Sequence, residues 1–285
     1  MDRTFAPVAL AACASFAMIG CMAPEDEVPG EDHRQVTAAL VPGDPPSGDN
    51  HFAANPFWAI DTQTAYRALG AGALVQSSGR LPPLEINPAY RIQVLRNAIE
   101  CGLGQDQTVT DRTGVVYTGH WGLARSWMTE PLTLSQRRYV TACMAQRLNA
   151  FELPVTILLN GLDEAINTDA NLDPDFPFDE STVWGDLFSS VAPVDDDGSA
   201  PFVLYACTDS DLNDLCTTVL SPEEWLDLRI CDTSDDRCGL MVLGNCDAVC
   251  TTGAPAAYRS SYPVCDSVVE TVHVQLAVGS CIPTP

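Results

Sequence analysis

The fold is decided by residues 133–161, which read TLSQRRYVTACMAQRLNAFELPVTILLNG. Thr133 and Gln136 have the spacing of a capping box, a pair of side chains that starts many helices. Apolar residues then recur at helical spacing along one side of the segment, at Val140, Cys143, Met144 and Leu148. The run 153–159 is short, continuous and apolar, and it ends at Asn160-Gly161, which is typical of a buried strand followed by a turn. The segment therefore predicts a helix that leads directly into a strand.

Helices are predicted mainly before this segment and strands mainly after it. Upstream, the sequence predicts a helix over 62–69, a second helix after Asn87-Pro88 that ends at Gly102, and a hairpin over 108–117. Downstream, it predicts a helix after Ser221-Pro222 and strands over 202–206, 240–243 and 272–278. In the last strand apolar and polar residues alternate, which places His273 on the solvent side.

This order predicts an α+β fold. A helical N-terminal half is expected to pack on a mixed or antiparallel sheet, and a disulfide-rich part is expected to follow. We predict a signal peptide over 1–20, an acidic tether rich in proline and glycine over 21–52, and a single domain over 53–285 whose cysteine-rich part is 207–285.

The apolar run at the N-terminus predicts export. It extends from Phe5 to Ile19, which is too short for a membrane-spanning helix of about 20 apolar residues and suits a secretory signal. Met18-Ile-Gly-Cys21 resembles the lipobox of bacterial lipoproteins, which implies cleavage before Cys21 and a diacylglycerol and palmitate anchor on that residue. Met22 is not aspartate, which implies the outer membrane as destination. Leu10-Ala-Ala-Cys13 matches a lipobox more closely by letter, but its hydrophobic core would have only about seven residues, so Cys21 is preferred. The other alternative is a plain secretory signal cut near Ala23.

Charge excludes several classes of function. The formal net charge is −24, and all 14 basic residues are arginine. Nucleic acid is not expected as a partner, because its phosphates repel such a surface. The absence of lysine excludes a Lys Schiff base, a Walker A loop and Ser-Lys catalysis. Residues 80–150 hold eight arginines against five acids, and residues 151–285 hold three against 24. We expect the arginines of the first half to lie against the acidic second half.

Ten cysteines remain after the signal and Cys21 are set aside, and an even number in an exported chain predicts disulfides. Cys101 and Cys143 stand apart from the others, each on a predicted helix, and we predict that they are bonded to each other. The pairing within the C-terminal cluster stays open. Zinc is not favoured, because no C-x-x-C occurs. The cluster consists of Cys207, Cys216, Cys231, Cys238, Cys246, Cys250, Cys265 and Cys281.

One acidic stretch has the spacing of a calcium loop. Oxygen-bearing side chains fall at loop positions one, three, five, seven and twelve, at Asp169, Asn171, Asp173, Asp175 and Glu180. Pro174 stands where a calcium loop has glycine. A solvated acidic loop is the alternative and explains the same composition.

The segment around the best helix also resembles a known group of proteins. The stretches NAIECG from Asn97, RYVTACMAQRLNAF from Arg138 and WGDLF from Trp184 are similar to those of large, uncharacterised, cysteine-rich lipoproteins of myxobacterial type. This resemblance covers about half of the mature chain and implies no activity.

No catalytic motif stands out. The chain has neither G-x-S-x-G nor H-E-x-x-H, and its four histidines are scattered along the sequence. We therefore expect an exported, membrane-anchored lipoprotein with a structural or binding role and an unknown envelope partner. The alternative is a secreted-type hydrolase that uses a pair of carboxylates as acid and base.

Overall fold

The computed structural model describes residues 47–49, 52, 54–58, 60–150, 155–167, 175–189, 204–209, 221–231, 238–251 and 264–277. All of them belong to one compact unit, Gly43–Pro285. The predicted signal peptide and Cys21 lie outside the described residues. The described part is an α+β structure with a mixed sheet and a disulfide-rich C-terminal part.

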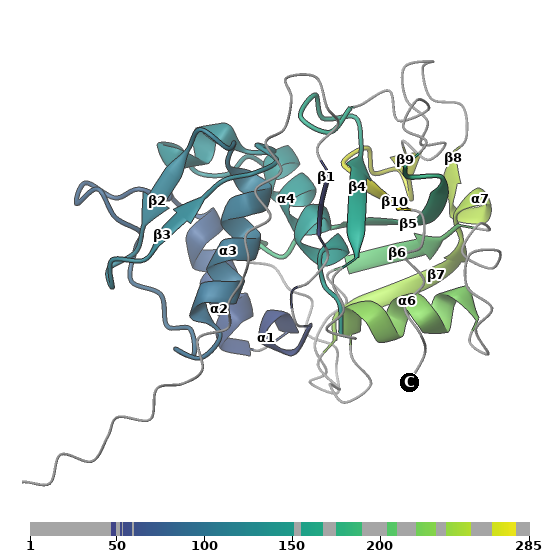
Figure 1. The fold of residues 1–285 in the computed structure, drawn as a ribbon, viewed down its shortest axis with the longest axis horizontal. Coiled ribbons are helices and arrows are strands. Elements are labelled where there is room, and N and C mark those ends of the chain that lie inside the picture. Colours follow the sequence, from purple (N-terminus) through teal and green to yellow (C-terminus); the bar gives the residue numbers. More distant parts are fainter. Residues whose placement is uncertain are drawn as a thin grey trace, which may run out of the picture. The chain divides into compact units, whose positions relative to one another are not determined.

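The sheet has six strands, and its middle is built from segments far apart in the sequence (Figure 1). Adjacent strands of the sheet run antiparallel, except for the last two in the spatial order, which run parallel to each other. In spatial order the strands are β1 (Ser47–Asp49), β4 (Thr156–Asn160), β10 (Val272–Leu276), β5 (Phe178–Gly185), β6 (Leu204–Thr208) and β7 (Leu240–Asn245).

Helices and two small ribbons complete the described elements. The helices are α1 (Ala54–Trp58), α2 (Ile60–Gly70), α3 (Arg91–Gly102), the 3-10 turn η1 (Arg125–Met128), α4 (Leu134–Gln146), α6 (Pro222–Cys231) and α7 (Cys246–Val249). The ribbons are β2 (Thr108–Thr110) with β3 (Val116–Thr118), and β8 (Cys250–Thr251) with β9 (Val264–Cys265).

The predicted segment 133–161 forms α4 and β4. The capping box is confirmed: the hydroxyl of Thr133 accepts from the backbone N–H of Gln136, whose side chain accepts from the Thr133 N–H. The helix is followed closely by a buried strand because the apolar sides of both elements pack into the same core. That core includes Val140 and Leu148 from the helical segment and Ile157 and Leu159 from β4, all fully buried.

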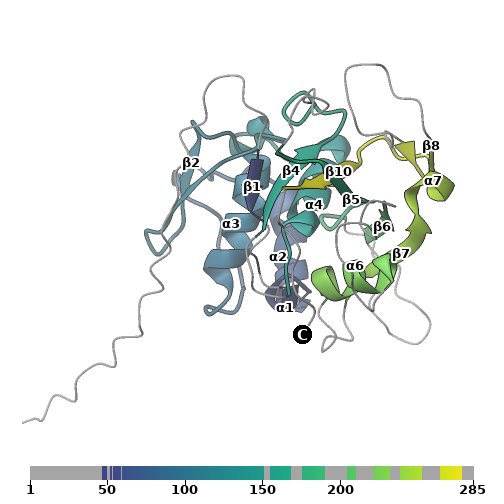
Figure 2. The ribbon, with the colours of Figure 1, turned by 45° about the vertical axis from the view of Figure 1, so that its right-hand side comes forward.

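One face of the sheet is covered by helices (Figure 2). α4 packs against β5 and β10, and α6 packs against β6 and β7. The two helices are joined directly, because Arg229 of α6 donates to the backbone oxygens of Gln146 and Leu148 at the end of α4.

The folded part begins before residue 53, where the composition placed the end of the tether. Residues 47–49 pair with β4. The buried Phe52 donates to the Arg147 backbone oxygen at 3.1 Å and accepts from the Asn149 N–H at 2.8 Å. Strand pairing of this kind uses backbone groups, so Ser47-Gly48-Asp49 needs no apolar pattern to join the sheet.

The expected charge complementarity is found for two arginines of α4, whereas Arg125 and Arg147 pair with acids of the basic stretch itself. Arg137 pairs with Asp186 at 3.0 Å, and Arg138 pairs with Glu270 at 2.9 Å. Each bridge joins the basic stretch of the chain to its acidic half.

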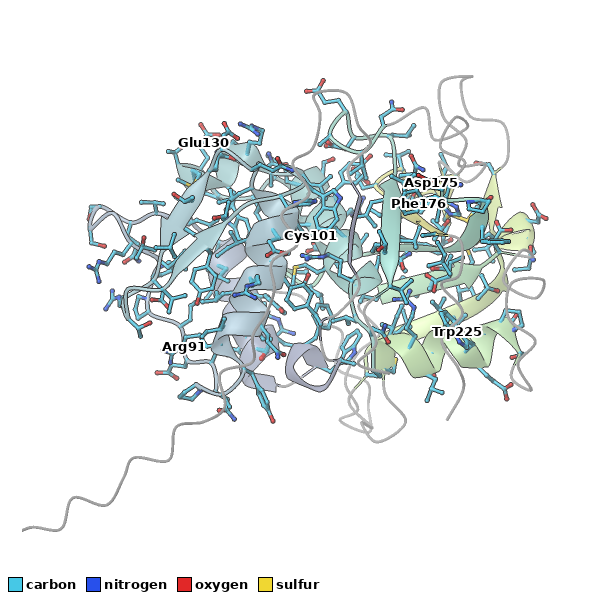
Figure 3. The ribbon with its side chains drawn as sticks, in the orientation of Figure 1. Arg91, Cys101, Glu130, Asp175, Phe176 and Trp225 are labelled. Carbon is cyan, nitrogen blue, oxygen red and sulfur yellow. A yellow bond between two sulfur atoms is a disulfide. The ribbon has the colours of Figure 1, made fainter. Side chains whose placement is uncertain are left out.

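The predicted Cys101–Cys143 disulfide is confirmed and joins α3 to α4, with Cys101 lying between the two helices (Figure 3). Three further disulfides lie in the C-terminal part, Cys207–Cys246, Cys231–Cys238 and Cys250–Cys265. Cys216 and Cys281 lie outside the described residues.

Candidate functional site

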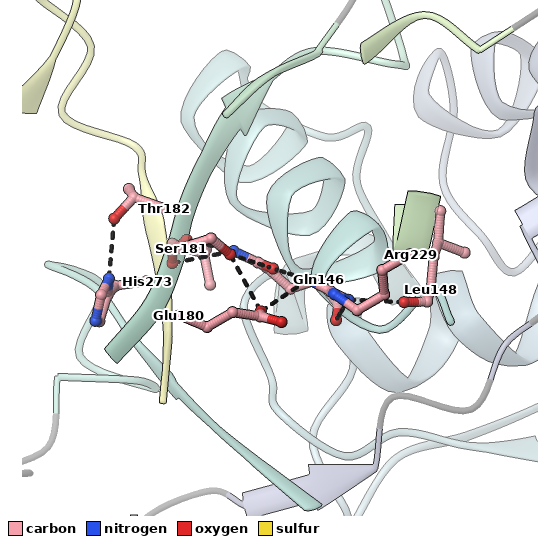
Figure 4. A network of polar contacts seen from close by, with 8 residues as sticks. Gln146, Leu148, Glu180, Ser181, Thr182, Arg229 and His273 are labelled. Atoms are coloured by element: carbon pink, nitrogen blue, oxygen red, sulfur yellow. Dashed lines mark hydrogen bonds and ion pairs between the residues drawn. The ribbon is translucent and has the colours of Figure 1, made fainter. Parts of the chain in front are cut away.

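A bulge in β5 organises the polar interior of the sheet. Ser181 pairs with Val274 and Asp179 pairs with Gln275, so Glu180 is an extra residue with no partner of its own on β10. A bulge of this kind interrupts the alternation of side chains between the two faces. Glu180 and Ser181 both contact groups on the helix side, whereas Thr182 contacts His273 on the other side (Figure 4).

On the helix side, the bulge meets a buried arginine. Arg229 Nη2 lies 2.8 Å from Glu180 Oε2, and neither side chain is exposed at all. The guanidinium also donates to the backbone oxygens of Gln146 at 3.0 Å and Leu148 at 2.7 Å, and to Gln146 Oε1 at 3.0 Å. The carbonyls at the end of a helix lack partners within the helix and attract positive charge. The side chain of Arg229 therefore caps the C-terminal carbonyl groups of α4 and also binds Glu180 of β5.

Gln146 extends this network into the sheet. Its Nε2 donates to the Ser181 backbone oxygen and hydroxyl at 3.3 and 3.2 Å, and to the Val272 backbone oxygen at 3.3 Å. Because Gln146 is the last residue of α4, the position of this helix is set against β5 and β10 by hydrogen bonds as well as by apolar packing.

Burial dominates the electrostatics of the ion pair. It raises the pKa of the Glu180 carboxyl, against the opposing attraction of Arg229 and the hydrogen bond from Ser181. It lowers the pKa of the Arg229 guanidinium, against the attraction of Glu180. In each case the charge of the partner opposes the effect of burial, and removal of one partner leaves a buried charge without compensation.

A second polar row crosses the other face of the sheet. Asn160 donates to Gln275, which donates to Asp179 Oδ1, at 2.9 and 2.8 Å. The two ring nitrogens of His273 lie 2.9 Å from Thr182 Oγ1 and 2.9 Å from Asp179 Oδ1. The row therefore links β4, β10 and β5 through side chains in addition to the backbone ladder.

The prediction that His273 faces solvent is wrong, because its exposed fraction is 1% and every residue of β10 is buried. Alternation indicated a half-buried strand, but this sheet is covered on both faces. On the face opposite α4 and α6, Trp184 and Cys207 pack against cysteines of α7, β8 and β9.

His273 is surrounded by acidic groups. Burial alone lowers the pKa of its imidazole, but the hydrogen bond to Asp179 and the charges of Asp179, Asp209 and Glu180 raise it further than burial lowers it. The net direction is upward, which favours the imidazolium form inside the sheet.

Thr182, His273 and Asp179 are the residue types of a hydroxyl nucleophile, a base and an orienting carboxylate. Thr182, however, is fully buried within β5, so a substrate has no path to its hydroxyl through the described residues. A cavity of about 10 Å³ is lined by Phe52, Phe57, Tyr66 and Asn97, among others. Leu148, whose backbone oxygen binds Arg229, is the only residue of the two polar networks in its described lining. The size of the cavity matches a single water. The geometry of the two rows supports a structural role.

The predicted calcium residues are not brought together by the described structure. Glu180 is bound by Arg229 inside the sheet, so a cation in the loop would lack this ligand. Asp175 is exposed. Asp169, Asn171 and Asp173 lie outside the described residues, and their calcium role stays a prediction.

The sulfurs of the C-terminal part do converge. The Sγ atoms of Cys207, Cys246 and Cys250 lie within 4.8 Å of one another, and all three residues are buried. Cys207 is bonded to Cys246, and Cys250 is bonded to Cys265. Two separate disulfides therefore touch on the face of the sheet beside Trp184.

Sequence reasoning missed Arg229 and Gln146, the two residues that connect α4, α6 and β5. The signal was weak: Arg229 lies between Leu228 and Ile230 in a helix with few polar neighbours on that side. A cation in such a place requires a buried acid as partner, but the sequence does not show which of 38 acidic residues provides it.

Among the described residues, no helix has the length and apolar character needed to cross a membrane. Comparison with known proteins found no matching family, no matching curated protein and no matching solved structure.

Proposed function

We propose that the protein is an exported lipoprotein, anchored to the outer membrane through lipid on Cys21, whose domain has a structural or binding role in the cell envelope. The observation that carries this proposal is the state of the eight cysteines in the described part, which form four disulfides. Disulfides persist in oxidising compartments outside the cytosol. The resemblance of Met18-Ile-Gly-Cys21 to a lipobox supplies the anchor.

A structural or binding role is supported by how the buried polar groups are used. Glu180 and Asp179, the adjacent carboxylates of β5, bond to Arg229 and to His273. A hydrolase that uses two carboxylates as acid and base needs both of them to face a substrate. Glu180 and Asp179 instead bind side chains of the protein itself. In this proposal the helical N-terminal half forms a layer on the sheet, which the bonds from Gln146 to β5 and β10 support.

The test is metabolic labelling with an alkyne analogue of palmitate in a Gram-negative host. The wild-type chain is expected to carry label and to fractionate with the outer membrane, and Cys21→Ser is expected to lose the label. Cys13→Ser is the matched control, since Cys13 lies within the predicted signal peptide, and it should remain labelled. An unlabelled wild-type protein whose N-terminus lies near Ala23 would show a plain secretory signal instead.

A further inference from the structure

Two disulfides of the C-terminal part lie in contact with each other. Cys207 Sγ and Cys250 Sγ, which belong to different bridges, are 3.5 Å apart. This is about the separation of two non-bonded atoms in van der Waals contact. Thiol–disulfide exchange proceeds by attack of a thiolate on a disulfide sulfur, so either sulfur would stand directly beside its target once it was reduced.

The local fold explains this contact. Cys246 and Cys250 are four residues apart at the two ends of α7, and residues at this spacing lie on one side of a helix. β7 leads directly into α7, and it pairs in parallel with β6, which carries Cys207. Both ends of α7 therefore present a sulfur to Cys207.

The four cysteines differ in their access to solvent. Cys250 is 8% exposed, whereas Cys207, Cys246 and Cys265 are 0% exposed. Of these two bridges, a reductant therefore reaches Cys250–Cys265 first, through the residue that neighbours Cys207. The separate Cys231–Cys238 bridge is more accessible than either, because Cys238 is partly exposed.

We propose that these two bridges form one thiol–disulfide exchange centre, in which reduction of Cys250–Cys265 by a dithiol moves the second bridge from Cys207–Cys246 to Cys207–Cys250. One thiolate of the dithiol attacks Cys250 Sγ and releases the Cys265 thiolate. The second thiol of the reductant then displaces Cys250, and the reductant leaves as its own disulfide with two electrons fewer. The free Cys250 thiolate attacks Cys207 Sγ, forms the Cys207–Cys250 bond and releases the Cys246 thiolate.

The exchange changes what the remaining bridge connects. The second step breaks one disulfide and forms another, so no further electrons are needed. α7 stays bonded to β6, through the residue after its last turn in place of its first residue. Cys265 of β9 becomes free, and the β8–β9 ribbon loses its covalent link. Reduction thus removes the covalent link between β8 and β9, while α7 remains linked to β6 by a disulfide.

The experiment is partial reduction of the full mature chain with a limiting phosphine, which is oxidised to its oxide as it reduces one bridge. Free thiols are trapped with N-ethylmaleimide, and the peptides are mapped without further reduction. A protease that cleaves at aspartate separates Cys246 from Cys250 at Asp247. We expect label on Cys231 and Cys238 from the more exposed separate bridge. Molecules reduced at the exchange centre should give a peptide pair joined through Cys207 and Cys250, with label on Cys246 and Cys265. Label on Cys250 and Cys265 with the Cys207–Cys246 bridge intact overturns the proposal.

A pair of variants tests the second step alone. Cys265→Ser leaves Cys250 without its partner, and we expect the Cys207–Cys250 bridge and a free Cys246 without any added reductant. Cys238→Ser is the matched control, because it frees Cys231 in a separate bridge and should leave both bridges of the centre unchanged. A Cys265→Ser protein with a free Cys250 and an intact Cys207–Cys246 bridge contradicts the exchange. If this variant does not fold, the partial reduction of the wild-type chain decides.

Discussion

Glu180 of β5 and Arg229 of α6 form an ion pair at 2.8 Å from which solvent is excluded on both sides. The two residues are 49 positions apart, and Arg229 also bonds the end of α4. A buried ion pair often stabilises a fold no more than apolar residues of the same size, because both charges lose their hydration. Its effect here is to require that three elements meet in one arrangement.

Removing one partner of this pair should be costly. Glu180→Gln leaves the guanidinium of Arg229 buried without a counter-charge, and we expect the free energy of unfolding to fall by about 3–5 kcal/mol. Urea denaturation measures the loss. Glu130→Gln is the control, because Glu130 is exposed and such surface changes stay within about 0.5 kcal/mol.

The double variant Glu180→Leu with Arg229→Met distinguishes the effect of an unbalanced buried charge from the effect of the hydrogen bonds that Arg229 makes to the end of α4. We expect it to recover most of the stability that Glu180→Gln loses, because no uncompensated charge remains. A double variant as unstable as Glu180→Gln would show that the hydrogen bonds of Arg229 to α4, and not its charge balance, hold this region together.

The sequence predicted correctly those helix starts and turns that depend on contacts between residues close together in the chain. The capping box at Thr133, the hairpin turn at residues 111–114 and the Ser221 start of α6 are all found in the structure, because each depends on residues within four positions. β1 could not be predicted, since its pairing with β4 is made by backbone groups more than 100 residues apart.

The buried polar residues of the sheet could not be predicted either, because their burial also depends on segments far away in the sequence. The buried state of His273 depends on the second layer over the sheet, and the inward turn of Glu180 depends on a bulge opposite β10. Neither feature has a sequence period of its own. The Cys101–Cys143 bridge was predictable because these two cysteines stand apart from the C-terminal cluster.

The stability of the domain should depend on the charge of His273. Its pKa is raised in the folded state by Asp179 and neighbouring acids, although burial opposes them. A raised pKa stabilises the fold fully below the unfolded pKa of about 6.5, and this contribution is lost as the pH rises through the folded value. We expect the stability difference between wild type and His273→Gln to be largest near pH 5.5 and to shrink toward pH 9.

Asp179→Asn provides the control for this pH dependence. The variant removes the carboxylate that bonds His273 at 2.9 Å, so in its background His273→Gln should produce a flatter difference over the same pH range. Urea unfolding at five or six pH values measures both pairs. An unchanged slope in the Asp179→Asn background would mean that another acid controls the titration.

The start of α4 should depend on the hydroxyl of Thr133. Thr133→Ala removes the acceptor for the Gln136 N–H, and we expect a loss of about 1 kcal/mol in the free energy of unfolding. Thr133→Ser keeps the acceptor and should retain most of the stability. Thr133 is exposed, so lost packing cannot account for the difference between the two variants. Equal losses for Ala and Ser would therefore contradict a capping role.

The four disulfides should not contribute equally, because they close loops of different length. Cys101 and Cys143 are 42 residues apart, and Cys231 and Cys238 are 7 apart. The chain-entropy relation gives about 4 kcal/mol for the longer loop and about 2.4 kcal/mol for the shorter one. We therefore expect the variant with Cys101 and Cys143 both changed to Ala to lose about 1.5 kcal/mol more stability than the matched variant at Cys231 and Cys238, measured by urea unfolding without reductant. Burial adds to this difference, since Cys101 and Cys143 are fully enclosed between α3 and α4 and their replacement also removes packed sulfur from the core. Equal losses at the two sites would show that the unfolded chain keeps α3 and α4 together without the bridge, and the entropy argument for this pair would fail.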